Sequence, residues 1–95
     1  YTGARGKSGS NDANAEYLAK LRSVFEADKV TYQTGELGKV DVGGGGTIAY
    51  ILALYGMNVT DCGVPVLNMH APWECISKAD LYEAKCGYVA FLKNC

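Results

Sequence analysis

Apolar residues recur along the chain at spacings that predict helices alternating with strands. After residue 12 they return every three or four positions, which is the period of one helix face. They are Tyr17, Leu18, Leu21, Val24 and Phe25. Just before them, Ser10, Asn11 and Asp12 offer side-chain oxygens that can cap the helix. We expect the apolar face of this helix to pack on a sheet.

A strand and then a second helix are predicted in the middle of the chain. Residues 30–34 alternate β-branched or aromatic side chains with polar ones, which is typical of a strand. Residues 35–46 follow as a predicted loop that ends in four consecutive glycines, and residues 47–55 are apolar on every side. This apolar segment predicts a buried helix, with Gly56 placed to end it in the left-handed conformation.

The last third of the chain predicts two short strands and a helix. The strands are residues 58–63 and 66–70, separated by Pro65, which cannot sit inside a hydrogen-bonded ladder. Ser77 and Asp80 have the spacing of a capping box at the start of a helix. The apolar face of that helix comprises Leu81, Tyr82, Tyr88, Val89 and Leu92. Strands that alternate with helices predict an α/β layer fold with a largely parallel sheet.

The composition is typical of a small globular domain. The chain has 95 residues, is 48% hydrophobic and carries a net charge of -1. Basic residues form no stripe, so we expect no nucleic-acid partner. The longest apolar run, residues 48–55, is too short to span a membrane. We expect one domain, residues 1–95, of a cytoplasmic protein, with an upstream part missing because the chain opens on Tyr1.

Four cysteines are spaced too widely for the usual metal and redox motifs. They are Cys62, Cys75, Cys86 and Cys95, and no two of them form a C-x-x-C pair. We therefore expect free thiols and not a zinc ribbon or a disulfide framework. A thiol-based function is a further hypothesis, and it requires an exposed thiolate near positive charge.

The run of glycines is a candidate binding turn. Gly44, Gly45, Gly46 and Thr47, called the glycine turn below, lead into the predicted helix. Free backbone amides at a helix N-terminus can bond a carbonyl or a carboxylate, and the helix dipole adds to the attraction. A flexible surface loop explains the same glycines equally well.

His70 is the only histidine, and it follows an apolar predicted strand. In open α/β sheets, ligands bind at this end of the strands. A neutral imidazole suits zinc, and Glu74 lies close enough in sequence to act in the first or second coordination shell. A lone histidine is also commonly structural, and a complete zinc site needs about three or four protein ligands. The carboxylates Glu36, Asp41 and Asp61 fall in loops or at strand ends, and no spacing among them indicates a role.

Three stretches of the sequence together resemble the C-terminal part of one peptidase family. They are GKSGSNDANAE, YQTGELGKVDVGGGGTIAYILALYG and DCGVPVLNMHAPWE. In this order and spacing they are similar to the bacterial-type aminopeptidase I / aspartyl aminopeptidase family of zinc metallopeptidases. The resemblance covers nearly the whole chain and implies a three-layer fragment of a zinc-peptidase-like doubly wound sheet.

The resemblance implies a role for several of the candidates. It makes His70 a ligand to one of two active-site zinc ions, Glu74 a family glutamate in the second shell, and the glycine turn a lining of the substrate pocket. The remaining ligands and the catalytic glutamate would lie upstream of Tyr1. No catalytic residue is then expected among these 95 residues, and the fragment alone is expected to be inactive. Cobalt and manganese also suit imidazole and carboxylate ligands.

Two functions follow from these observations. In the first, the full-length protein is a homo-oligomeric aminopeptidase that removes the N-terminal residue of peptides with a metal-activated water. In the second, the chain is a non-catalytic structural or oligomer-assembly module. A single histidine and a missing set of ligands favour the second for the fragment itself. The sequence leaves the preferred N-terminal residue and the metal open.

Overall fold

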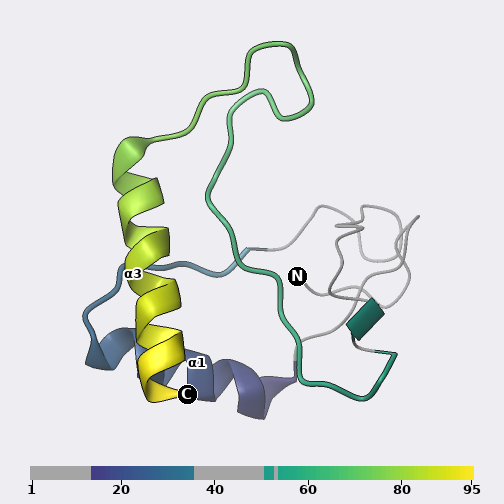
Figure 1. The fold of residues 1–95 in the computed structure, drawn as a ribbon, viewed down its shortest axis with the longest axis vertical. Helices are drawn as coiled ribbons and strands as arrows, with labels where there is room; N and C mark the ends of the chain where they lie inside the picture. The colour runs from purple at the N-terminus through teal and green to yellow at the C-terminus, as the bar shows by residue number, and fades with distance from the viewer. Residues whose placement is uncertain (1–13, 36–50, 53) are drawn as a thin grey trace. The chain divides into compact units, whose positions relative to one another are not determined.

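The computed structural model describes residues 14–35, 51–52 and 54–95. Its two main helices are α1 (Ala15–Ala27) and α3 (Lys78–Asn94), shown in Figure 1. The chain divides into two compact units, Tyr1–Ala19 with Gln33–Asp61, and Lys20–Tyr32 with Cys62–Cys95. Within the described ranges no strand is formed, and the predicted α/β sheet is therefore not confirmed. No helix in these ranges is long and apolar enough to cross a membrane.

Asn14 caps the first helix. Its side-chain Oδ1 accepts a hydrogen bond from the Tyr17 amide (2.7 Å), and its carbonyl accepts one from the Leu18 amide (3.1 Å). These bonds satisfy backbone donors that a helix N-terminus otherwise leaves unpaired. The helix itself was predicted correctly. The predicted caps at residues 10–12 lie outside the described residues, and it is Asn14 that makes the capping bond.

The C-terminal end of α1 explains why the strand predicted at residues 30–34 is not formed. Lys29 adopts a left-handed φ of 56°, and the Val30 amide donates to the Phe25 carbonyl (2.8 Å). The Lys29 amide donates to the Glu26 carbonyl (3.2 Å), which completes a Schellman motif. This motif turns the chain back, so Val30 packs against α1 and α3. The strand prediction was wrong because a lysine seldom adopts this conformation and gives no turn signal.

In the segment that follows, residues 31–32 form hydrogen bonds with side chains instead of with a neighbouring strand. The Thr31 amide donates to Glu83 Oε2 on α3 (3.0 Å). The Tyr32 hydroxyl accepts from Arg22 Nε (3.2 Å) and donates to Glu26 Oε1 (3.0 Å). The Tyr32 ring also lies 5.4 Å from the ring of Phe25, a common aromatic separation. The segment is therefore fixed to the two helices without a neighbouring strand.

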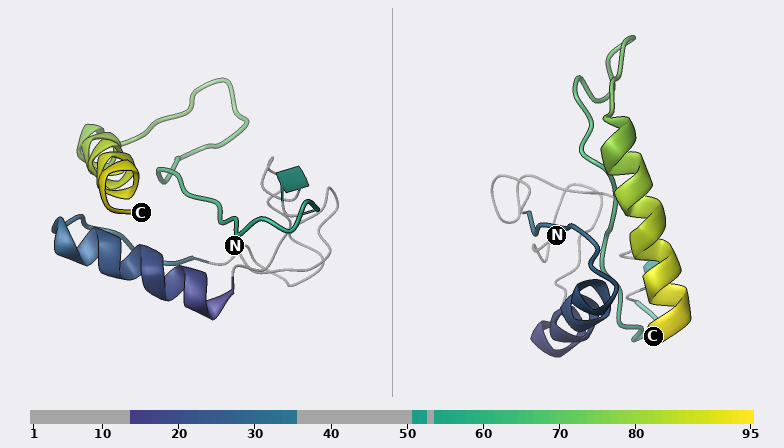
Figure 2. Two further views of the ribbon diagram at one scale, coloured as in Figure 1. Left: turned by 60° about the horizontal axis from the view of Figure 1, so that its bottom comes forward. Right: turned by 90° about the vertical axis from the view of Figure 1, so that its left-hand side faces the viewer.

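Helix α3 lies beside the C-terminal end of α1 (Figure 2). The contact is made by small residues of α3. Ala90 is 0% exposed and forms the core of this unit with Val24 and Val30. Gly87 also faces this core, and a Cβ added there would lie 3.6 Å from the side chains of both Phe25 and Val30, an ordinary contact distance. The apolar face predicted for this helix, namely Leu81, Tyr82, Tyr88, Val89 and Leu92, is exposed in the described structure. The small residues of α3, not the large ones, face α1.

Ser77 caps α3 as the sequence predicted. Its Oγ accepts from the Ala79 amide (3.2 Å), and its backbone is extended, as expected of a cap residue. Asp80 lies in the first turn and Lys93 in the last, and both charges complement the helix dipole. The cap at Ser77 and the predicted helix are therefore confirmed, but the capping bond goes to Ala79 and not to Asp80, as a capping box would require.

The middle of the chain differs from the prediction in its burial and pairing. Residues 51–52 are helical, and Gly56 has a φ of 75°, as expected of a residue that ends a helix. The predicted buried helix is nevertheless exposed where it is described, with Leu54 80% exposed. The strands predicted at 58–63 and 66–70 are replaced by irregular chain with one isolated bridge. A strand requires a partner edge, and the described residues supply one only at Leu67.

Candidate functional site

A closed loop, residues 67–75, carries the only histidine and is called the His70 loop. An isolated antiparallel bridge joins its two ends. The Leu67 amide donates to the Cys75 carbonyl (2.9 Å), and the Cys75 amide donates to the Leu67 carbonyl (3.1 Å). These two hydrogen bonds fix the distance between the arms. The loop is therefore closed at its base although no sheet supports it in the described chain.

Two residues inside the loop adopt the left-handed conformation. Asn68 has a φ of 57° and His70 a φ of 68°. Asparagine tolerates this region, but for histidine the conformation costs on the order of 1 kcal/mol. The Ala71 amide donates to the Asn68 carbonyl (3.0 Å), which closes a turn around the pair. The loop thus holds His70 in a backbone conformation that an isolated peptide would seldom adopt.

Glu74 contacts the backbone of His70. Its Oε1 accepts a hydrogen bond from the His70 amide (2.5 Å). A hydrogen bond to a charged group contributes about 1.5–3 kcal/mol, which is enough to offset the strain at His70. Both residues are exposed, so solvent screening reduces this contribution toward the lower figure. The sequence indicated both residues but gave no sign of the contact between them.

The loop can supply one metal ligand but not a complete site. The His70 residue is exposed, so its imidazole is accessible, and imidazole nitrogen is a common zinc donor. In the chain as far as it is described, no three His, Cys, Asp or Glu side chains gather where they could hold a metal ion. The donor set therefore fits zinc only if other ligands come from elsewhere.

The other predicted site residues are not brought to the loop by the described structure. Gly44, Gly45, Gly46 and Thr47 lie outside the described residues, as do Glu36 and Asp41. Asp61 is described and half-buried. Cys62, Cys75 and Cys95 are exposed free thiols, and Cys86 is a half-buried one. The Tyr82 hydroxyl is hydrogen-bonded to Cys86, which raises the pKa of Tyr82.

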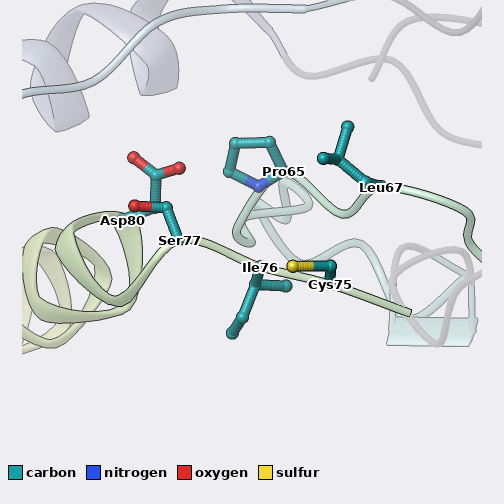
Figure 3. A pocket seen from close by; sticks show the side chains of 6 residues that line it. All are labelled: Pro65, Leu67, Cys75, Ile76, Ser77 and Asp80. Carbon is teal, nitrogen blue, oxygen red and sulfur yellow. The ribbon is translucent and has the colours of Figure 1, made fainter. Parts of the chain in front are cut away.

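A pocket adjoins the base of the His70 loop (Figure 3). It has a volume of about 380 Å³ and lies between the loop and the start of α3. Its lining side chains are Pro65, Leu67, Cys75, Ile76, Ser77 and Asp80. Apolar groups dominate, and Ser77 and Asp80 add the polar ones. The sequence did not predict this pocket, because the residues form no motif and meet only when the loop closes.

Comparison with known proteins identifies the family. The model of the aminopeptidase I zinc metalloprotease (M18) family matches residues 4–92. The chain belongs to this family. A probable M18 family aminopeptidase 1 from Clostridium acetobutylicum is 70% identical over 94 residues, which are 99% of this chain and 20% of that protein. The corresponding protein of Thermotoga maritima is 50% identical and is covered to 21% of its length. The family predicted from the sequence is confirmed.

Solved structures of the M18 family contain the same fold segment. The crystal structure of aminopeptidase I from Clostridium acetobutylicum matches 99% of this chain and 21% of its own, with a TM-score of 0.85 at 70% identity. That of the M18 family aminopeptidase from Thermotoga maritima matches all of this chain and 21% of its own, with a TM-score of 0.87 at 48% identity. The chain therefore spans about a fifth of the length of the relatives it matches.

Proposed function

We propose that this chain is the C-terminal segment of the catalytic domain of a zinc-dependent aminopeptidase, and that His70 is a ligand to one of two zinc ions. The family match over residues 4–92 carries the proposal. The His70 loop supports it, because a closed loop presents an accessible imidazole at a defined backbone position. The fragment alone is expected to be inactive, since the described residues bring no three metal donors together.

The chain would contribute binding groups, and the chemistry would need the rest of the protein. Bound zinc lowers the pKa of a water and polarises the carbonyl that the water attacks. His70 would hold the metal, Glu74 would act from the second shell, and the amides of the glycine turn would bind the peptide substrate. The group that removes the proton from the water would lie in the remaining four fifths of a full-length relative.

The complete domain would have the three-layer, doubly wound α/β sheet expected from the sequence. Residues 58–63 would pair there with strands of the missing chain, because an extended segment forms a strand only beside a partner edge. Homo-oligomeric assembly, a cytoplasmic location and two metal ions per site belong to the same proposal. Cobalt or manganese would bind the same donors as zinc.

Release of N-terminal residues tests this proposal. The full-length protein is incubated with a set of short peptides, with and without added zinc, beside its His70→Ala variant. Activity should depend on the metal and fall more than about 100-fold in the variant, because a lost ligand weakens the site more than a lost second-shell group. Lys85→Ala, an exposed change on α3, is the control and should leave the rate unchanged.

A non-catalytic assembly module is the second candidate. The observation that favours it is the exposed apolar face of α3, which suits packing against another surface better than catalysis. A folded, zinc-loaded full-length protein that releases no residue from any peptide would support this second function and contradict the first.

A further inference from the structure

The contact between Glu74 and the His70 amide indicates how the glutamate acts on the candidate metal site. Glu74 directs its Oε1 to the main chain of His70. Glu74 also directly precedes Cys75, which is hydrogen-bonded across the base of the loop to Leu67. Glu74 therefore lies next to the closed base of the loop, and its carboxylate reaches a residue in the left-handed conformation.

The backbone conformation of His70 determines where its imidazole points. At a φ of 68° the Cβ leaves the chain in a direction that the ordinary helical and extended conformations do not give. Without an acceptor for its amide, His70 would be held in this conformation by the Ala71–Asn68 turn alone, and it would adopt the ordinary conformations more often, because they lack the steric conflict. The imidazole would then move away from the position in which it is now held.

We propose that Glu74 is a positioning residue, which sets the direction of the His70 imidazole by holding the His70 amide and does not bind the metal itself. This inference rests on the proposed role of His70 as a zinc ligand. It deepens that role, because it assigns the contribution of Glu74 to the main chain. Partners of metal-binding histidines more often contact the second ring nitrogen.

The proposal separates two properties of the glutamate side chain. Holding an amide requires an oxygen acceptor at the right distance and does not require a negative charge. Ligation of zinc, or a charge effect on the imidazole, requires the carboxylate. Glu74→Gln keeps the acceptor and the length but removes the charge. Glu74→Asp keeps the charge but withdraws the acceptor by one methylene, and Glu74→Ala removes both.

Zinc affinity of the full-length protein, measured by competition with a chelator, tests the proposal without reference to activity. Glu74→Ala and Glu74→Asp should lower the affinity by about 10–100-fold, the range found for outer-shell partners. Glu74→Gln should stay within about threefold of the parent, since the neutral acceptor still binds the amide. If Glu74→Ala does not fold, comparing the zinc affinities of Glu74→Gln and Glu74→Asp still separates an acceptor role from a charge role.

Glu83 provides a matched control, because its Oε2 accepts the Thr31 amide in the same way, away from the loop. Glu83→Ala should leave the zinc affinity unchanged. A loss for Glu74→Gln as large as that for Glu74→Ala would overturn the proposal in favour of ligation or charge, and so would unchanged affinity in Glu74→Ala. An unchanged affinity in His70→Ala would instead contradict the proposed function, so the two failures are distinguishable.

Discussion

Gly87 offers a direct test of the packing between α1 and α3. The change Gly87→Ala removes a glycine from a helix interior, which stabilises a helix by about 0.8–1.0 kcal/mol. The added Cβ would lie 3.6 Å from Phe25 and Val30, an ordinary contact distance, so no repulsion opposes this gain. Burial of the new methyl group contributes up to about 0.8 kcal/mol more. We expect a net stabilisation of about 1–2 kcal/mol.

Hydrogen exchange of α3 in the full-length protein measures this local effect. Amides of Lys78–Asn94 that exchange through opening of the helix should exchange about 5–30-fold more slowly in Gly87→Ala. Gly56→Ala is the matched control, and it should destabilise the protein instead of stabilising it. Gly56 has no atom within 4 Å of an added Cβ, but its φ of 75° is strained for alanine. Faster exchange in Gly87→Ala would show that the contact between α1 and α3 has no room for the added methyl group, and would refute this reasoning.

Two further predictions concern the cap of α1 and a hydrogen bond made by α3. Asn14→Ala removes the cap of α1 and should destabilise its first turn by about 1 kcal/mol, seen as faster exchange there while α3 is unaffected. The electrostatic effect of Cys62 raises the pKa of Tyr88, and burial raises it further. The Tyr88 hydroxyl donates a hydrogen bond to the Cys62 carbonyl (3.1 Å). The protonated Tyr88 hydroxyl should therefore contribute fully to stability below pH 10, and this contribution should be lost as the pH rises further. Absorbance titration of the protein beside its Tyr88→Phe variant checks this.

The helices were predictable because their signals are local. The spacing of apolar residues located α1 and α3, and Ser77 and Gly56 marked ends that the structure confirms. Burial was less predictable. The periodicity of α3 shows which large residues are suited to a core, but the packing that forms depends on what lies opposite, and α1 meets Gly87 and Ala90. A small residue gives no apolar signal of comparable strength.

The candidate site was predictable by residue but not by geometry. A lone histidine after an apolar segment and a glutamate four residues later were sufficient to select His70 and Glu74. Their contact depends on a left-handed histidine, and this conformation is uncommon even for histidine, although histidine is enriched in it relative to most residues. Asn68 did carry a usable signal, because asparagine is enriched in that conformation, and it helps to form the turn on which His70 lies.

The exposed apolar face of α3 has a practical consequence for work on this segment. Leu81, Tyr82, Tyr88, Val89 and Leu92 are all more than half exposed on one helix. Contiguous apolar surface of this kind promotes self-association at the concentrations used for recombinant expression. A polypeptide of this sequence produced by itself would therefore collect in inclusion bodies unless a solubilising fusion or a detergent shields the helix.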